Sequence, residues 1–391
     1  MNDSSIMVGA KDHAYRASFS NSPTFMPDDD PARIDKLLEC VERQRYSKFF
    51  AVYMELEKMA PKACADTGFS DSVLDIMGLP TEHRIELVND PAFQIWLNRT
   101  FVVVNGILTG ATNDEQLLTG SLLEFSAMRR RFDDRKKDKR ILRVPRTGTL
   151  VQRFDIDPLI ASATPPSYEF PSDMEKRQHL EREGYSLAFF KDLVTIALER
   201  ISETWPECCR QFKRLVKVIG YIPDATFRSC SASRYTGVIY LATKDSSMLD
   251  IEESLVHEAG HQLLYNIVEV NAVNWDDTPD DEMYTLPWSG RQRDFYGYFH
   301  AFYIYVLLVK YFEKVNGRSE EEQMISRRRM VFILRGLVRA LPDFEGNRNF
   351  TPHGTELFQN LRNTVRELEE NHRHLLKEIE SPIALKVDHV E

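Results

Sequence analysis

Residues 254–265 read Ser254-Leu255-Val256-His257-Glu258-Ala259-Gly260-His261-Gln262-Leu263-Leu264-Tyr265, an apolar run that carries the pattern His-Glu-x-x-His. Side chains four residues apart lie one above the other on the same face of an α-helix. The imidazoles of His257 and His261 can therefore reach one metal ion from a single helix. We predict that this run is a metal-binding helix around which the rest of the chain is arranged.

Glu258 directly follows the first histidine, so its side chain points about 100° around the helix from that of His257. This direction places the carboxylate beside the predicted metal site. There it can act as a base, orient a metal ligand or serve as a weak ligand. We name Glu258 as the candidate catalytic residue and leave these roles open.

The composition is that of a globular protein with a sizeable core. Of 391 residues, 42% are hydrophobic, which is enough for one large domain or two. The formal net charge of -10 and a pI near 5.6 argue against a general nucleic-acid or anionic-membrane surface, because both favour a basic face. No run of 18 residues lacks a charged side chain, so we expect no membrane span.

The five cysteines form no Cys-x-x-Cys pair, and their odd number in a chain without a secretory signal indicates reduced thiols. We therefore expect a cytoplasmic protein without disulfides. Residues 1–30 are polar and lack the apolar core of a signal peptide. We predict that they form a disordered tail.

Hydrophobic periodicity divides the remaining chain into three regions. Residues 31–140 form a helical N-terminal region, and residues 141–172 hold short strands and a proline-rich linker. Residues 173–391 form the metal-binding catalytic region with C-terminal helices, in which 215–222 and 237–243 are the best strand candidates. The predicted fold class is α+β, mainly α-helical, with a zincin-like core of strand plus metal-binding helix and helical additions at both ends.

Two histidines do not complete a metal site, so the third ligand decides the chemistry. The extended zinc-peptidase pattern requires a histidine six residues after His261, and this chain has Ile267 there. A thermolysin-like site requires a glutamate about twenty residues further on, usually from a second helix. Glu282 has this spacing, but it lies in an acidic, proline-containing loop.

His300 lies within a strongly apolar helix predicted over residues 294–314. A buried imidazole needs a partner for its nitrogens, which either a metal ion or a hydrogen bond within the core can supply. Just ahead of this helix, Arg291 and Arg293 can each fork onto a carboxylate. An arginine fixed near a three-ligand metal would suit a keto acid whose far carboxylate it holds. Pairing with Asp294 is the alternative.

The histidine helix sequence is followed, in order, by Pro287-Trp288 and by Arg293-x-x-x-Gly297-x-x-His300-Ala301-Phe302. With Leu255-Val256-His257-Glu258-x-x-His261, this series resembles the HExxH-containing peptide-modification proteins, some of which are α-ketoglutarate-dependent iron oxygenases that hydroxylate β-carbons. Two upstream segments are similar as well, Pro91-Ala92-Phe93-Gln94-Ile95-Trp96 and Gly237-Val238-Ile239-Tyr240-Leu241. The resemblance covers roughly residues 90–315.

The resemblance implies three iron ligands, His257, His261 and His300. It also implies that an arginine, Arg293, binds the α-ketoglutarate carboxylate. Family members often carry an arginine directly after Pro-Trp, where this chain has Ser289. Arg291 can substitute for that arginine. The predicted cosubstrate site therefore consists of Arg293, Arg291 and Trp288.

The function predicted from these residues is that of an Fe(II)- and α-ketoglutarate-dependent oxygenase. It would hydroxylate, at a β-carbon, a peptide, a carrier-bound amino acid or a free amino acid, as in natural-product biosynthesis. One alternative is a zinc metallopeptidase in which Glu258 is the general base. Another is a metal-stabilised binding protein with a closed four-ligand site completed by Glu282 or Glu258. Neither a nucleic acid nor a membrane is an expected partner.

Overall fold

The computed structural model describes residues 24–28, 31–111, 115–134, 137–161, 185–223, 227–231, 236–242, 246–275, 278–279, 281–315 and 318–378. Helices dominate these residues, and the strands form one small mixed sheet and a separate hairpin. The prediction of a mainly α-helical α+β fold is therefore confirmed. The zincin-like arrangement of its core stays a prediction.

The N-terminal helices enclose an aromatic core. They are α2 (Pro31–Met59), α3 (Pro61–Asp66), α4 (Phe69–Gly78), α5 (Thr81–Val88), α6 (Pro91–Leu108) and α7 (Glu115–Asp134). Asp90 begins α6, because its carboxylate accepts hydrogen bonds from first-turn amides and Pro91 has no amide to satisfy. Inside this group, Phe49 and Phe125 pack around Trp96. Helices thus occupy the described residues between 31 and 134, as predicted.

The five-stranded sheet has the order β1-β2-β3-β5-β4, with bounds β1 (Ile141–Arg143), β2 (Leu150–Arg153), β3 (Val218–Tyr221), β4 (Ser229–Cys230) and β5 (Val238–Leu241). Strands β2, β3 and β5 are parallel, whereas β1 and β4 pair antiparallel at the two edges. Every residue of β3 and β5 is buried, as expected for parallel strands covered on both faces. Both strands fall within the predicted strand segments.

The sheet separates two hydrophobic cores. Val218 and Val238 face the core of the N-terminal helices, which also contains the short helix α8 (Pro158–Ala161). Ile219 and Ile239 face a larger core. That core is formed with α10 (Leu187–Thr204), α11 (Pro206–Leu215) and α12 (Met248–Val270).

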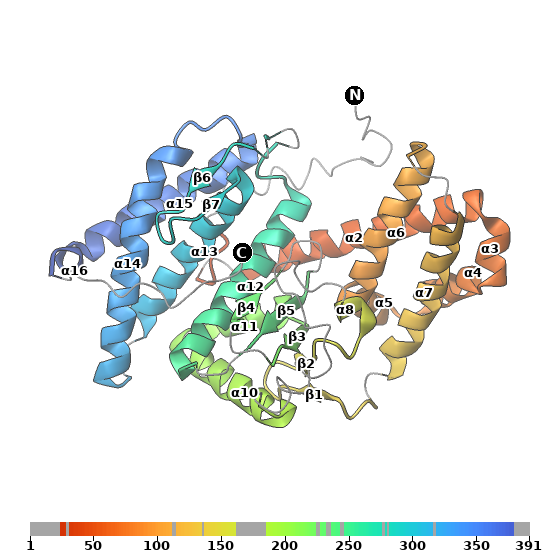
Figure 1. The fold of residues 1–391 in the computed structure, drawn as a ribbon, viewed down its shortest axis with the longest axis horizontal. Helices are drawn as coiled ribbons and strands as arrows, with labels where there is room; N and C mark the ends of the chain where they lie inside the picture. The colour runs from red at the N-terminus through yellow and green to blue at the C-terminus, as the bar shows by residue number, and fades with distance from the viewer. Residues whose placement is uncertain are drawn as a thin grey trace.

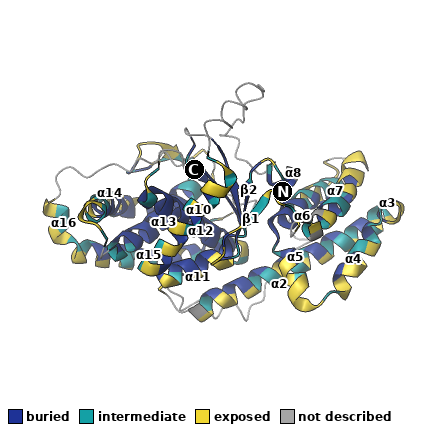
Figure 2. Ribbon diagram, turned by 90° about the horizontal axis from the view of Figure 1, so that it is seen from below, coloured by how far each residue is buried: buried dark blue, intermediate teal, exposed yellow. Residues whose placement is uncertain are grey.

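Helix α12 holds the His-Glu-x-x-His segment and is almost entirely buried (Figure 2). Ser247 and Asp250 start it with a capping box, in which each side chain binds the other residue's backbone amide. In the next turns of the same helix, the Gln262 amide accepts a hydrogen bond from Gly237 N (2.5 Å) and donates one to Val238 O (2.9 Å). This two-point contact fixes α12 against the start of β5.

The C-terminal part adds a hairpin and four helices. Their bounds are β6 (Tyr284–Thr285), β7 (Gln292–Arg293), α13 (Phe295–Lys314), α14 (Glu320–Phe344), α15 (Pro352–Asn371) and α16 (Arg373–Glu378). Figure 1 shows the sheet and α12 in the middle of the molecule, with α3–α7 on one side and α13–α16 on the other. Helices α15 and α16 are separated by His372.

The predicted disordered tail was wrong for residues 24–28. Phe25 and Met26 are buried in the larger core. Their backbone is held from two sides, because Tyr303 Oη donates to Thr24 O (3.0 Å) and Gln211 Nε2 donates to Phe25 O (3.3 Å). Two apolar side chains in a polar segment suffice to bind it to the core. The other residues of the predicted tail, 1–23 and 29–30, lie outside the described residues. The proline-rich part of the predicted linker, residues 162–172, also lies outside them.

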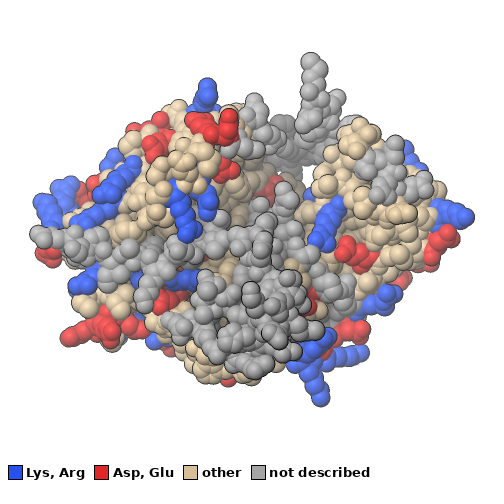
Figure 3. All heavy atoms as spheres, in the orientation of Figure 1, with Lys and Arg blue, Asp and Glu red and all other residues tan. Residues whose placement is uncertain are grey.

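The surface and the thiols agree with a globular chain. Among the described helices, none combines the length and the apolar character needed to cross a membrane. All five cysteines are free thiols. Acidic and basic side chains are mixed on the face that Figure 3 shows.

Candidate metal centre

The three predicted histidine ligands line one cavity of about 420 Å³. His257 and His261 come from successive turns of α12, and His300 comes from the neighbouring helix α13. All three imidazoles are buried. The other residues of the cavity wall are Cys230, Ser231, Glu258, Tyr265, Met283, Gln292, Arg293, Asp294, Tyr296 and Gly297.

The α12 pair has the spacing of two ligands on one ion. The Nε2 atoms of His257 and His261 are 3.1 Å apart. Two nitrogens that each lie about 2.1 Å from an ion are about 3.0 to 3.4 Å apart at the usual ligand angles. An N–H···N hydrogen bond has a similar length, so the distance fits a metal and also fits its absence.

His300 lies near the His257–His261 pair, but its ring is not turned toward a point that all three histidines could share. Its ring lies nearly parallel to that of His261, with an interplanar angle of 17° and a centroid distance of 5.8 Å. In the described residues, no three His, Cys, Asp or Glu side chains stand in positions from which they could hold one ion together. A shared ion would therefore require the His300 ring to turn toward the α12 pair.

One buried nitrogen supports a ligand at this position. Within the described part of the chain, His300 Nε2 makes no hydrogen bond. A buried polar atom without a partner loses its hydration with nothing in return, and a metal ion or an ordered water would compensate for it. The donor set thus fits a transition metal that prefers imidazole.

The electrostatics of the cavity keep these histidines neutral. Burial lowers the pKa of His261 to about 3. Burial, and then the neighbouring His261, also lower the pKa of His257 and His300 well below the ordinary value. A neutral imidazole is the form that binds a metal, so no proton has to be displaced at pH 7.

Two tyrosines close the cavity around His300. The ring of Tyr296 lies 4.1 Å from the His300 ring, and the ring of Tyr265 lies 5.3 Å from it. Tyr265 Oη is 3.5 Å from Ser231 O, at the end of edge strand β4. These rings restrict water at the histidines and would orient a bound molecule. The sequence interpretation missed both, because aromatic residues in apolar helices usually signal core packing.

Glu258 lies where its helical direction predicts, on the cavity wall and almost fully buried. The Cys230 thiol lines the same wall. Burial raises the pKa of Cys230, and the charge of Glu258 raises it further. The carboxylate is thus close enough to act on a molecule in the cavity as a base or as an orienting group.

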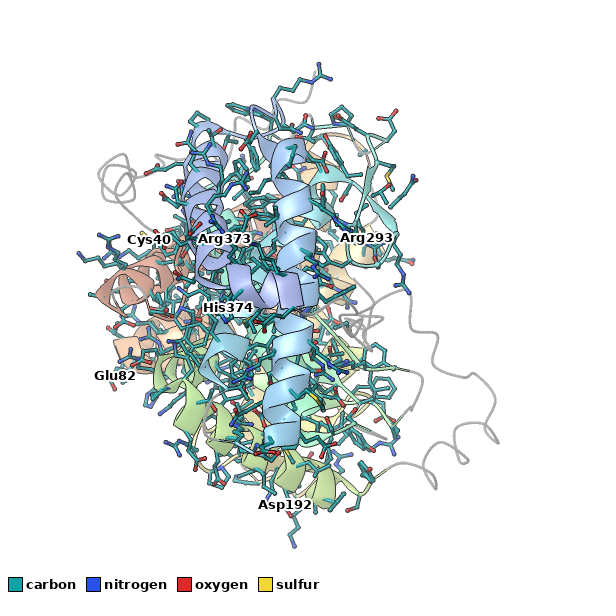
Figure 4. The ribbon with its side chains drawn as sticks, turned by 90° about the vertical axis from the view of Figure 1, so that its left-hand side faces the viewer. Cys40, Glu82, Asp192, Arg293, Arg373 and His374 are labelled. Carbon is teal, nitrogen blue, oxygen red and sulfur yellow. The ribbon has the colours of Figure 1, made fainter. Side chains whose placement is uncertain are left out.

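The two arginines predicted for the cosubstrate have different positions. Arg293 ends β7 and lines the cavity, and Figure 4 labels it beside the C-terminal helices. Arg291 is exposed and is not part of the cavity wall. Asp294, the predicted alternative partner, caps α13 by accepting a hydrogen bond from Gly297 N (2.7 Å). Arg293 is therefore the arginine that could hold a ligand in this cavity.

Trp288, which is predicted from the sequence to bind the cosubstrate, is not part of the cavity wall and packs between helices. Its indole Nε1 donates to Ile333 O of α14 (3.0 Å), and its ring packs 4.4 Å from that of Tyr305. Gly336 makes room for it, since a Cβ at this position would lie 2.1 Å from the indole nitrogen. Trp288 thus joins α13 to α14 and does not line the cavity.

Glu282, the thermolysin-like alternative, faces elsewhere. Its carboxylate accepts hydrogen bonds from Tyr284 Oη (2.8 Å) and Asn349 Nδ2 (3.0 Å). It is not part of the cavity wall. These contacts lower its pKa, so the carboxylate already has partners of its own. The described structure gives Glu282 no role at the histidines.

Gly260 sets the distance between the two helices that carry the histidines, α12 and α13. A Cβ there would lie 2.7 Å from Leu307 Cδ2 and 2.8 Å from Ile304 Cδ1, both on α13. Alanine normally stabilises a helix by about 1 kcal/mol relative to glycine. We nevertheless expect Gly260→Ala to lower the free energy of unfolding by about 1–3 kcal/mol, because the buried Leu307 and Ile304 side chains must shift within a packed core. His300 lies on the same helix as these side chains, so metal affinity should fall in parallel.

The matched control is Gly120→Ala in α7, where a Cβ would meet no atom within 4 Å. This variant should keep or slightly increase stability, as helix propensity alone dictates. Urea unfolding of both variants gives the comparison. If Gly260→Ala were as stable as Gly120→Ala, the close contact between α12 and α13 would be disproved.

A scan of the chain against models of known protein families found no match. A search of curated proteins also found none with significant similarity.

Proposed function

We propose that this protein is an Fe(II)- and α-ketoglutarate-dependent oxygenase of the HExxH-containing peptide-modification type. One observation carries the proposal: three buried, neutral histidines and one arginine, Arg293, line a single cavity. Imidazole suits iron, and three protein ligands would leave positions for a keto acid and oxygen. The cavity of about 420 Å³ is within the usual range for small-molecule sites.

Each part of the wall has a role in this proposal. His257, His261 and His300 would hold the metal, which supplies the oxidising chemistry for hydroxylating an unactivated carbon. Arg293 would fork onto the far carboxylate of α-ketoglutarate and so fix its orientation. Tyr265 and Tyr296 would exclude water from the reacting carbon. The substrate would be an amino-acid unit that is free, carrier-bound or part of a peptide, hydroxylated at its β-carbon.

The test is anaerobic reconstitution of the full chain with Fe(II), followed by titration with α-ketoglutarate. Binding should produce a visible absorbance that depends on both components, and admission of air should then yield succinate. Neither signal should arise with Zn(II). Stoichiometric iron without any α-ketoglutarate-dependent absorbance would refute the proposal.

Arg293 should control the affinity for α-ketoglutarate. A desolvated bidentate contact between charged groups contributes about 2–4 kcal/mol, so Arg293→Ala should raise the dissociation constant about 30- to 1000-fold. Arg293→Lys keeps the charge but loses the fork, and it should lie between wild type and alanine. Anaerobic titrations with iron content measured in parallel give these values.

Arg291→Ala is the matched control, because Arg291 lies two residues away and outside the cavity wall. It should bind α-ketoglutarate like the wild type. Equal affinity in the Arg293→Ala and Arg291→Ala variants, both with iron bound, would remove the cosubstrate from this cavity.

The burial of Glu258 in the cavity wall favours one second candidate, a zinc metallopeptidase. In that reaction Glu258 would take a proton from water, and Glu258→Gln should reduce turnover by orders of magnitude. In the oxygenase Glu258 would only orient other groups, so Glu258→Gln should have a milder effect on succinate formation. Oxygen-independent peptide hydrolysis by the zinc form, lost in Glu258→Gln, would favour the peptidase.

A further inference from the structure

A second cavity, of about 320 Å³, lies between the β1–β2 turn and the α10–α11 junction. Three basic side chains border it: Arg146 from the turn, and Arg210 and Lys213 from α11. Its residues are all different from those of the histidine cavity. The chain as a whole is acidic, with a net charge of -10, so a local excess of positive charge is a departure from the average surface.

No described carboxylate forms an ion pair with any of the three cations, although Glu207 lies in the same cavity wall. Neither Arg146, Arg210 nor Lys213 makes an ion pair or a side-chain hydrogen bond with the residues described. Several other arginines, such as Arg200 and Arg329, pair with buried carboxylates. Like charges gathered around one space repel each other, and a bound anion would remove this repulsion.

The framework that presents these groups is fixed. Gly148 adopts a positive φ of 74°, and Gly148 N donates to Val144 O (2.8 Å) to close the turn that carries Arg146. Thr149 Oγ1 donates to Val216 O (3.1 Å), which joins the turn to the end of α11. Arg210 and Lys213 lie three residues apart on α11, so their side chains project from the same face. The backbone that carries the three cations is therefore fixed, and their exposed side chains extend from it around the cavity.

The floor of the cavity is polar. The hydroxyls of Thr147 and Ser202 line it and are mostly buried. The Cys209 thiol lies beside them. Burial raises its pKa, whereas the Ser202 hydroxyl, Arg146 and Lys213 act in the opposite direction. The charges of Arg146 and Lys213 thus act on the Cys209 thiol at the cavity wall.

We propose that this cavity binds the phosphate group of a small phosphate ester. Among the described residues of the wall, three are cations and one, Glu207, is an acid. Their net charge of about two positive units matches a phosphate monoester near pH 7. Two guanidinium groups can fork onto phosphate oxygens, and the Lys213 ammonium adds a point charge. The space exceeds that of phosphate alone, so it also accommodates the esterified part, for which Glu207 can accept a hydrogen bond.

Isothermal titration calorimetry of the full chain with glycerol 3-phosphate, inorganic phosphate and malonate measures the affinity for each and tests this proposal. Glycerol 3-phosphate should bind at least as well as phosphate, and malonate should bind more weakly than both. The titrations are repeated on Arg293→Ala, which removes the one arginine of the histidine cavity and should leave these affinities unchanged. No binding of either phosphate probe at millimolar concentration would overturn the proposal, as would tighter binding of malonate.

Single substitutions locate the binding. Arg210→Ala and Lys213→Ala should each weaken glycerol 3-phosphate binding about 10-fold or more, because each removes a charged contact. Both side chains are exposed, so the variants should fold normally. Arg339→Ala removes an equally exposed arginine from α14 and is the matched control. Equal affinities in all three variants would place the phosphate elsewhere and refute the site.

Discussion

His300→Ala is expected to abolish stoichiometric binding of Fe(II), and of Zn(II) as well. The residue comes from α13, whereas the other two proposed ligands share α12. Removing one of three ligands should cost several kcal/mol of metal affinity, which is a loss of at least about 100-fold. Metal content after dialysis against a defined free-metal buffer, together with circular dichroism, measures the effect.

The matched control is His353→Ala. His353 is a partly buried histidine whose pKa burial lowers to about 4, but it is not part of the cavity wall. This variant should retain the metal. Full metal occupancy in His300→Ala would show that α13 supplies no ligand and that His257 and His261 act with another group.

Arg329→Ala is expected to lower the free energy of unfolding by about 3–5 kcal/mol. Arg329 is buried and binds Glu253 and Asp250, at 2.5 Å each. Without its guanidinium, Arg228 is the remaining cation beside these two buried carboxylates among the described residues, at 3.5 Å from Glu253 and 3.9 Å from Asp250. Asp250 also keeps its hydrogen bonds from Ser247. A loss of this size is a large fraction of the stability of a typical domain. Urea unfolding at neutral pH measures it.

The effect of Arg329→Ala on the free energy of unfolding should also depend on pH. Burial alone would raise the pKa of Asp250, but the Ser247 hydrogen bonds and Arg329 outweigh it and lower the pKa. A lowered folded-state pKa contributes stability above the unfolded pKa, and this stability is lost as the pH falls through the folded pKa. The difference between wild type and Arg329→Ala should therefore be largest near neutral pH and shrink in acid.

Arg366→Ala is the control for this variant, because Arg366 makes an exposed pair with Glu369 on α15. Exposed pairs contribute about 0–1 kcal/mol. If Arg329→Ala lowered the free energy of unfolding no more than Arg366→Ala, the buried ion pairs of Arg329 would make no net contribution to stability.

The local geometry of the histidine helix was predictable because it depends on helix periodicity alone. The four-residue spacing of His257 and His261 fixes their common face, and the helical direction of Glu258 places it on the same wall. The approach of His300 depends on the packing of α13 against α12, which involves Gly260. Periodicity cannot provide this long-range contact, so the residue series of the family resemblance was the only guide to it.

The position of Trp288 could not be predicted from the order of the motifs. Its indole packs against Gly336, 48 residues later in the chain, and sequence order does not reveal such a long-range contact. The burial and the ion pairs of Glu252 and Glu253 could not be predicted from the sequence either. In sequence they resemble a solvated helix start, and only the tertiary structure brings Arg318 and Arg329 to them.

The anchoring of residues 24–28 has a consequence for proteolysis and solubility. Phe25 and Met26 occupy part of the larger core, and Asp28 pairs with Lys310 of α13 (2.9 Å). Cleavage between this segment and α2 would leave residues 24–28 held to the rest of the molecule by noncovalent contacts alone. Their loss would expose apolar surface beside α13, and exposed apolar surface favours self-association.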